Sequence, residues 1–435
     1  MQHIKKKGSK MEGSIKFNDA LKALCSIESV ANIDVSEAEP YGKGCAEALN
    51  YMLELCNSFG FKTVNRDNKI GYAEIGSGDE LVGILCHLDV VPAGSGWTYP
   101  AYDLTETGDR LYGRGVTDDK GPAMACVYAM KEILEERAPI KRRIRIIFGQ
   151  SEETGDWNDM EYYKAHEELP DFGFTPDADF PAINGEKRLL CFTLHLPVEK
   201  NGILSLSGGS APNIVADSCT VEYKAASGAG GISIKGKAAH ASTPDLGKNA
   251  ILRAMEILGE NEKISSPLVG FFKKYVGTCV HGEKMGCALE DAESGKLTMN
   301  IGKARTAHGI IEFTVDVREP VSFEDSAVIE SLTNAAAEFG ISVEMTENKP
   351  PVYMDRDGEI IQKLLNVYRN ATGDVAEPMV IGGGTYAKAM KNIIAYGPML
   401  PGRELTEHMA NEYILKDDME LIRKIYKNAI LALAE

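Results

Sequence analysis

This 435-residue sequence lacks long apolar runs, an excess of basic residues and paired cysteines. No stretch approaches the roughly 18 uninterrupted apolar residues that a membrane helix needs, so no membrane partner is expected. Lysine and arginine total 47 against 64 acidic residues, and the net charge of −17 argues against nucleic acid or an anionic membrane surface. The basic segment 1–10 lacks the apolar core of a secretory signal, so it is expected to be a lead-in before the first helix.

The nine cysteines form no C-x-x-C pair and are odd in number, which does not suit a regular disulfide framework. Most of them lie in apolar contexts, where a free thiol behaves as a small hydrophobic side chain. Reduced core thiols in a cytoplasmic protein are therefore expected.

Helical and strand patterns alternate from about residue 16 to residue 185, and the length of the chain suggests two domains. The alternation predicts an α/β fold with a mixed, largely parallel sheet and helices on both faces. The segments with helical spacing are 17–26, 42–58 and 121–136, and the predicted strands are Ile70–Ile75, Leu81–His87 and Arg143–Phe148.

The pattern changes near Lys187, after which strand-like runs predominate. Residues 188–349 are therefore predicted to form an inserted α+β lid domain. Helical patterns return beyond that point, so residues 1–187 and 350–435 are expected to form one discontinuous α/β catalytic domain.

His87 and Asp89 stand at the end of the apolar run 81–86. Side chains at positions i and i+2 of a strand project to the same face, so both residues can contact the same ligand, such as a divalent metal ion. Ligands of parallel α/β sheets bind beyond the carboxyl ends of the strands, where this motif falls. Taken alone, a His-x-Asp motif is more often a hydrogen-bonded structural pair.

Two further acidic pairs follow glycine-rich or strand-like segments. Asp118 and Asp119 directly precede a predicted helix, where the alternative interpretation is an N-cap followed by an ordinary helix start. Glu152 and Glu153 follow the strand that ends at Phe148. Adjacent side chains of an extended segment point in opposite directions, so one glutamate can bind a metal ion while the other contacts a water molecule. A solvated acidic loop would have the same sequence pattern.

Asp177 and Asp179 follow another apparent strand, and His408 lies near the C-terminus. A rigid turn explains the first pair, and a surface or capping residue explains the histidine. The joint occurrence of these segments favours a metal site over each separate explanation. Histidine nitrogens and carboxylate oxygens suit Zn²⁺ and also Mn²⁺ or Co²⁺, and the absence of cysteine argues against a structural zinc.

The order of these segments and their amino-acid sequences resemble those of a known family. The longest stretches are HLDVVPAGSGW at 87–97 and LYGRGVTDDKGP at 111–122. They look like the dinuclear zinc metallopeptidase family that includes carboxypeptidase G, aminoacylases, desuccinylases, carnosinases and bacterial dipeptidases. The resemblance covers nearly the whole chain and is greatest to the peptidase V-like dipeptidase branch.

The resemblance implies a role for each residue of the first metal site. His87 matches a ligand of the first metal, and Asp89 matches the residue that orients it. Asp118 matches a carboxylate that bridges two metals and is followed by a non-proline cis peptide bond. Asp177 matches the remaining ligand of the first metal, with Asp179 as the alternative because the register is ambiguous.

The resemblance also implies the catalytic base and the second metal site. Glu152 matches the general base, which takes a proton from a water activated by the two metals. Glu153 and His408 match the ligands of the second metal. Zinc is the preferred metal, with manganese or cobalt as alternatives.

Other residues are expected to contact the substrate. His240, which follows a predicted strand of the insert, matches a ligand of the developing oxyanion, although it could instead cap the next helix. Asn213 is a weaker candidate from the same domain. Arg318 could bind a substrate carboxylate with two hydrogen bonds or form a surface ion pair. The glycine-rich loop whose backbone could cradle the substrate contributes Gly383, Gly384 and Thr385.

The sequence therefore predicts a cytoplasmic metallodipeptidase whose partner is a small-molecule dipeptide. The first alternative is an N-acyl-amino-acid deacylase or desuccinylase on the same scaffold. A remote alternative is a non-catalytic metal-binding scaffold, which would be expected to lack a ligand or the base. The size of the insert favours a monomer over a homodimer.

Overall fold

The computed structural model describes residues 15–435 except 199–201, 226–227, 261–263, 265 and 324–325, so the basic N-terminal segment lies outside the described residues. The chain folds into two compact units. Unit 1 comprises residues 1–182, 356–378 and 385–435, and unit 2 comprises residues 183–355 and 379–384. The sequence did not predict the return of 379–384 to unit 2.

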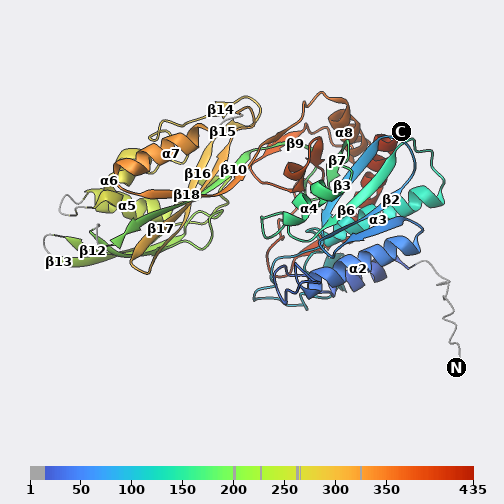
Figure 1. Ribbon diagram of the computed structural model, residues 1–435, viewed down its shortest axis with the longest axis horizontal. Helices are drawn as coiled ribbons and strands as arrows, with labels where there is room; N and C mark the ends of the chain where they lie inside the picture. The colour runs from blue at the N-terminus through green and yellow to red at the C-terminus, as the bar shows by residue number, and fades with distance from the viewer. Residues whose placement is uncertain (1–14, 199–201, 226–227, 261–263, 265, 324–325) are drawn as a thin grey trace. The chain divides into compact units, whose positions relative to one another are not determined.

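Unit 1 is built on a mixed sheet (Figure 1). Its strands, in spatial order, are β1 (Lys62–Arg66), β2 (Ile70–Ile75), β6 (Arg143–Gly149), β3 (Leu81–His87), β7 (Phe172–Thr175) and β21 (Ile393–Ala395). β3 runs parallel to β6 and β7, and β21 runs parallel to β7. β1 and β2 are antiparallel additions at one edge.

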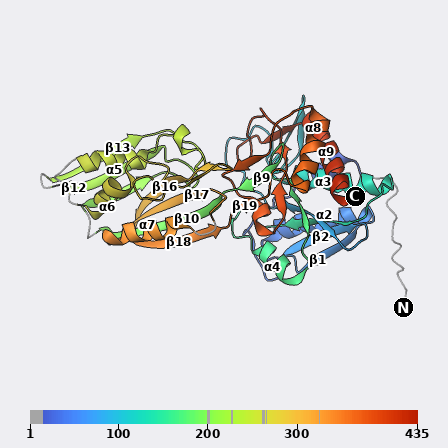
Figure 2. The same cartoon turned by 90° about the horizontal axis from the view of Figure 1, so that it is seen from above.

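Helices cover both faces of this sheet, as Figure 2 shows with α3 and α9 on one side and α4 on the other. The helices of unit 1 are α1 (Phe17–Cys25), α2 (Lys43–Ser58), α3 (Lys120–Glu135), α4 (Asn158–His166), α8 (Glu359–Thr372) and α9 (Lys416–Ala434). Every residue of β2 and β3 is buried, because a strand covered on both faces has no exposed side.

Short elements complete unit 1. β4 (Thr105–Thr107), β5 (Arg110–Tyr112) and β23 (Tyr413–Leu415) form a small antiparallel sheet. β8 (Ala178–Asp179) pairs in parallel with β22 (Pro398–Met399), and the 3₁₀ helix η4 covers Tyr386–Ala389. β5 and β23 matter for the site because they hold two distant segments of the chain side by side.

Unit 2 is built on a seven-stranded antiparallel sheet. Its strands, in spatial order, are β13 (Gly228–Lys235), β12 (Ser218–Ala225), β11 (Ile203–Gly208), β16 (Thr298–Ala307), β17 (Ile310–Glu319), β10 (Arg188–Pro197) and β18 (Ser342–Lys349). The helices α5 (Ala250–Glu260), α6 (Pro267–Phe271) and α7 (Ala327–Glu338) pack onto it and bury one apolar core with its strands (Figure 1).

The remaining elements of unit 2 are short. They are β9 (Ile183–Glu186), β14 (Glu290–Asp291), β15 (Gly295–Lys296), β19 (Val352–Tyr353), β20 (Met379–Ile381), η2 (Pro244–Leu246) and η3 (Phe272–Val276). β20 pairs with β9, and this pairing attaches the segment 379–384 to unit 2.

The predicted fold class is confirmed: an α/β sheet domain with parallel central strands accompanies an α+β insert. The sequence missed β1 and the helix α4. β1 is only five residues long and is not fully buried, so it carries little hydrophobic pattern. α4 begins at Asn158, close to the acidic residues 152–153, and its polar sequence hides its helical period.

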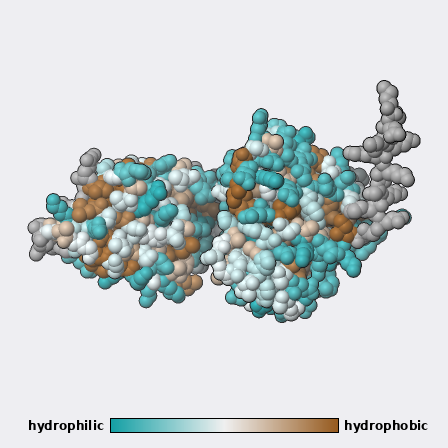
Figure 3. Space-filling view, turned by 90° about the horizontal axis from the view of Figure 1, so that it is seen from below, coloured by the Kyte–Doolittle hydropathy of each residue, from teal (hydrophilic) through white to brown (hydrophobic). Residues whose placement is uncertain are grey.

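Among the described residues, no helix combines the length and apolar character needed to cross a membrane. Figure 3 shows mostly hydrophilic and neutral residues on the face displayed, with apolar residues in small separate patches. Scattered exposed apolar residues of this kind are ordinary on a protein surface.

Candidate metal centre

Three parallel strands of unit 1 deliver the predicted site residues to one edge of the sheet. His87 is the last residue of β3, and its partner in the register of β6 is Gly149. Glu152 therefore follows β6 at the same edge, and Asp177 follows β7 there. The edge beyond the carboxyl ends of parallel strands is the usual place for a site in such folds.

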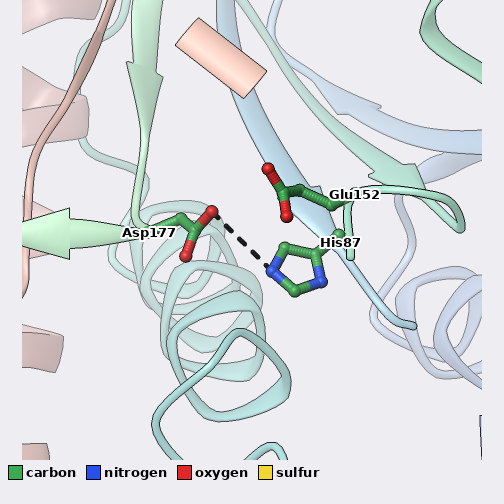
Figure 4. Close-up of side chains that lie close together, drawn as sticks. All are labelled: His87, Glu152 and Asp177. Atoms are coloured by element: carbon green, nitrogen blue, oxygen red, sulfur yellow. Dashed lines mark ion pairs between the residues drawn. The ribbon is translucent and has the colours of Figure 1, made fainter. Parts of the chain in front are cut away.

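A first group that could hold a metal ion consists of His87, Glu152 and Asp177. One ligand atom from each residue lies within 4.8 Å of the others. His87 Nε2 is 3.7 Å from Asp177 Oδ2, and Figure 4 shows the three side chains converging. Asp179, the alternative from the sequence, is not a member of this group.

A second group consists of Asp118, Glu153 and His408, again with ligand atoms within 4.8 Å of one another. His408 Nε2 lies 3.0 Å from Asp118 Oδ2 and 3.0 Å from Glu153 Oε2. His408 thus faces acidic side chains and does not cap a helix. Its side chain is nevertheless 54% exposed, so the alternative of a surface residue is correct about its exposure.

Asp118 connects the two groups. Its Oδ1 lies 2.9 Å from His87 Nε2, while its Oδ2 lies 3.0 Å from His408 Nε2. One carboxylate therefore directs an oxygen toward each histidine. A mixed set of imidazole nitrogens and carboxylate oxygens, shared through a carboxylate, fits a pair of divalent cations such as Zn²⁺.

These contacts displace the pKa values of the side chains. Burial opposes the charged form of His87, but hydrogen bonds with Asp118 and Asp177 outweigh it and hold its pKa well above its usual value. Hydrogen bonds to Asp118 and Glu153 raise the pKa of His408 to about 11. Burial also disfavours the charge of Asp118, yet its two histidine partners hold its pKa below the usual range. Burial raises the pKa of Glu153 to about 7.

Glu152 differs from its neighbour in its charge environment. Burial raises the pKa of Glu152 well above its usual value, and the nearby charge of Asp177 adds to the increase. A carboxylate with a raised pKa binds a proton more readily at neutral pH, as a general base must. The geometry alone allows Glu152 to be either a ligand or a base, because it also belongs to the first group.

Asp89 supports the site in two ways. His87 Nδ1 lies 2.9 Å from the backbone carbonyl oxygen of Asp89 and 3.5 Å from its Oδ1. A proton on Nδ1 that donates to the carbonyl leaves Nε2 unprotonated and able to bind metal. The carboxylate of Asp89 accepts the backbone N–H of Glu152 at 3.2 Å and that of Glu153 at 3.0 Å. Its main role is thus to hold the loop that carries the two glutamates.

The peptide bond between Asp118 and Asp119 is cis, as the resemblance implied. Asp119 is fully buried, and its Oδ2 accepts the backbone N–H of His87 at 3.1 Å. Asp119 is the residue before α3, but its side chain makes no capping hydrogen bond, so the N-cap interpretation does not hold. The sequence flagged the pair of aspartates without giving the second one a role.

The sequence also missed a buried pair behind the glutamate loop. The Tyr386 hydroxyl donates to Asp159 Oδ2 at 2.5 Å. The same oxygen accepts the backbone N–H of Gln150 at 2.6 Å and that of Ser151 at 3.1 Å. The pair fixes the chain just before Glu152. No local pattern links these positions, since Tyr386 lies 227 residues from Asp159.

The predicted substrate residues of unit 2 cluster around His240. The Ser242 backbone N–H points to His240 Nδ1 at 3.3 Å, and the Ser242 hydroxyl lies 2.7 Å from the same atom. An accepting Nδ1 places the proton of a neutral ring on Nε2, which can then donate. Burial and the nearby Arg318 lower the pKa of His240, which favours the neutral ring. Asn213 is adjacent, since its carbonyl accepts the Ala241 N–H at 2.9 Å.

Arg318 is held by its neighbours. Its Nε and Nη2 donate to the two carboxylate oxygens of Asp316 at 2.6 and 2.7 Å, and its Nη1 donates to the Gly382 carbonyl at 2.8 Å. Asp316 therefore occupies the two-donor edge that a substrate carboxylate would need. Of the two alternatives from the sequence, the ion pair is the one present, but it is buried and does not lie on the surface. An added Cβ on Gly382 would meet Ser242 Cβ at 2.5 Å, so this position requires glycine.

The rest of the glycine-rich loop is divided between the two units. Gly383 and Gly384 follow Gly382 in unit 2, and Thr385 belongs to unit 1. The Thr385 hydroxyl accepts the Ala387 N–H at 3.1 Å and caps η4. Thr385 therefore has a structural role in addition to any contact with substrate.

The α/β sheet and the two groups of histidines and carboxylates beside it are those of a metal-dependent enzyme. The sequence model of peptidase family M20/M25/M40 matches residues 83–432. The chain belongs to this family and is a metallopeptidase.

One relative in sequence agrees with this assignment, and two solved structures share the fold. A Staphylococcus haemolyticus protein whose name includes the word dipeptidase is 34% identical over 467 aligned residues, which cover 99% of each chain. Human carnosine dipeptidase 1 has a similar fold, with a TM-score of 0.63, 16% identity and 96% of each chain covered. A metallo-carboxypeptidase from Sulfolobus solfataricus gives a TM-score of 0.64 at 18% identity, over 96% of this chain and 99% of the other.

Proposed function

We propose that this chain is a dipeptidase that works with two divalent cations, with zinc preferred and manganese or cobalt accepted by the same donors. The observation that carries the proposal is the position of Asp118 between His87 and His408. His87 and Asp177 would hold the first cation, Glu153 and His408 the second, and Asp118 both.

The cations, when bound, supply Lewis-acid activation of a water molecule and of the substrate carbonyl. Glu152 takes the proton of the attacking water and passes it to the leaving amine. Asp89 keeps Glu152 in place through the backbone N–H that it accepts. Asp119 and Asp89 together fix the orientation of His87 through its backbone N–H and its Nδ1.

Unit 2 would act as a lid and contribute the groups that recognise the substrate. His240 Nε2–H would donate to the oxygen that gains negative charge during the reaction. Gly383, Gly384 and Thr385 would contact the substrate, with Arg318 and Asn213 supporting that side. Because the insert provides this surface within one chain, we expect a monomer.

A dipeptide is the preferred substrate because the relative that is 34% identical carries the name dipeptidase and aligns along its whole length. An N-acyl amino acid presents the same amide bond and carboxylate, so a deacylase is the second candidate. The two candidates differ in the group on the acyl side, which is charged in a dipeptide at neutral pH.

The test is a hydrolysis panel of dipeptides and N-acyl amino acids on protein treated with EDTA and then resupplied with Zn²⁺, Mn²⁺ or Co²⁺. The proposal predicts loss of dipeptide hydrolysis on chelation and its return with metal. Hydrolysis that resists chelation would contradict the metal mechanism, and a preference for N-acyl amino acids would favour the deacylase. Metal binding without any hydrolysis would indicate a non-catalytic scaffold.

A further inference from the structure

Glu412 is a fully buried carboxylate close to the metal centre that the mechanism does not use. Its Oε1 accepts the backbone N–H of Thr117 at 2.9 Å and that of Asp118 at 3.3 Å. Its Oε2 accepts the backbone N–H of Gly115 at 3.1 Å and Nη1 of Arg114 at 2.8 Å. The Glu412 side chain thus holds the segment 114–118, which includes Asp118, through four hydrogen bonds.

The same residue ends the loop that carries His408. His408 has a positive φ of 61°, and its side chain is 54% exposed, so its own packing does not fix it. The loop is held beyond the histidine instead. Asn411 Oδ1 accepts the Thr98 backbone N–H at 2.7 Å, and Glu412 makes the buried contacts to the Asp118 segment.

Backbone contacts extend the connection between these two segments. The Gly113 N–H donates to the Glu412 carbonyl at 3.1 Å, and the Thr117 hydroxyl donates to the Tyr413 carbonyl at 3.2 Å. Tyr413 then pairs with Tyr112 where β23 meets β5. The segments around Asp118 and His408 are therefore joined along their length, with Glu412 at the end nearest the site.

We propose that Glu412 is a positioning residue that holds Asp118 and His408 at a fixed separation and thereby sets the cation affinity of the second group. The inference rests on the metal-binding role proposed above. The carboxylate acts mainly through the main chain, since three of its four hydrogen bonds come from backbone N–H groups of the segment 115–118 and the fourth comes from the Arg114 side chain. It touches neither the substrate nor a reacting atom.

The charge and shape of Glu412 both matter to this role. A glutamine in its place has the same size but only one accepting oxygen, so its amide group would face backbone N–H donors with nothing to accept. Arg114, which is 2% exposed, would also lose its carboxylate partner. The segment would have to shift, and the distance between Asp118 and His408 would change with it.

The experiment compares Glu412→Gln with Glu404→Gln, an exposed glutamate of the same region that accepts a hydrogen bond from the Tyr413 hydroxyl. Apo-protein is titrated with Zn²⁺ or Mn²⁺ by calorimetry, and the metal content is measured after dialysis. We expect Glu412→Gln to lower the affinity for the cation of the second group about 10–100-fold. This is the range seen when residues that support metal ligands are changed. Glu404→Gln should bind like the wild type.

Hydrolysis as a function of metal concentration provides the second measurement. The metal concentration at half-maximal rate should rise in Glu412→Gln, while kcat at saturating metal should recover toward the wild-type value. General structural damage would lower kcat at every metal concentration. Wild-type affinity in folded Glu412→Gln, or a loss of kcat that saturating metal does not restore, would overturn the proposal.

Arg114→Lys keeps the test decisive if Glu412→Gln does not fold. It retains the positive charge but loses the guanidinium geometry that reaches Glu412, so cation binding should weaken by a smaller factor. Unchanged binding in Arg114→Lys would overturn the proposal in that case. The number of cations bound by the wild-type protein tests the proposed function separately, because a single bound cation would contradict a two-cation site. The ratio of the cation affinities of variant and wild type tests the role of Glu412.

Discussion

The Asp89 carboxylate accepts the backbone N–H of Glu153 at 3.0 Å, although the two residues are 64 positions apart. Its other oxygen accepts the N–H of Glu152 at 3.2 Å. Asp89 therefore determines where both glutamates stand. The contact of Asp89 with His87, which the sequence emphasised, is made chiefly by its backbone carbonyl.

Asp89→Asn tests this arrangement. An asparagine keeps one accepting oxygen and turns an NH₂ group toward the other backbone N–H, which leaves a buried donor unsatisfied at a cost of about 1–3 kcal/mol. We expect kcat/KM to fall about 10–100-fold, with a smaller change in metal content, because the carbonyl that orients His87 is unaffected. Steady-state kinetics and metal analysis are the measurements, and full activity would contradict the role assigned to Asp89.

Glu152→Ala should keep its metals yet lose hydrolysis. Removing a general base lowers kcat by about 10²–10⁴-fold, whereas removing a ligand also lowers metal content. The exposed Asp156 on the same loop supplies the control variant Asp156→Asn, which should behave like the wild type. Full activity in Glu152→Ala would refute its role as the base, and a clear loss of metal would identify it as a ligand.

Arg318→Met tests whether this arginine acts through the glycine loop or on the substrate directly. Because Asp316 occupies its two-donor edge and Gly382 takes Nη1, we expect kcat/KM to fall on the order of 10-fold for a dipeptide and equally for its C-terminal amide. A loss confined to the free acid would instead show direct recognition of the carboxylate. Arg305→Met, at an exposed arginine paired with Glu312, is the control.

Metal binding should release protons. In protein stripped of metal, Asp118 and Glu153 raise the pKa of His408 to about 11, so the ring is charged at neutral pH. That value lies above the unfolded value of about 6.5, so the contribution of His408 to the stability of the stripped protein is complete below about pH 6.5 and is lost as the pH rises toward about 11.

A cation must displace this proton, so the apparent affinity should increase between about pH 6 and about pH 8. Calorimetric titrations in buffers of different ionisation enthalpy count the protons released. An affinity independent of pH, with no proton release, would contradict the pairing of His408 with the two acids.

The sequence predicted strands and candidate ligands best where an apolar run is followed by a histidine or a carboxylate. β2 and β3 have the bounds predicted for them. In β3 the apolar run 81–86 is ended by His87, which is why the same pattern predicted both the strand and a candidate ligand. The antiparallel position of β1 and the helix α4 were missed because neither carries a strong apolar period.

The supporting residues could not be predicted from local pattern. Asp159 and Tyr386 meet across 227 residues, and Gly382 reaches Arg318 from a loop that is 64 residues further along the chain. The pairing of Arg318 with Asp316 is local, because both residues lie on β17. Glu412 lies four residues after His408, but only its buried contacts with the segment 114–118 reveal what it does.

The sequence by itself determined the fold class, the family and the set of side chains able to bind cations, since strand ends and their motifs are local. The resemblance implied how those side chains are grouped, but the contacts that bring them together in this chain are made by its tertiary structure. The parallel pairing of β3 with β6 and β7 brings His87, Glu152 and Asp177 to one edge of the sheet. The long-range hydrogen bonds of Asp89 and Glu412 then position the loop of Glu152 and Glu153 and the segment of Asp118. A hydrogen bond depends on distance in space and not on separation in sequence.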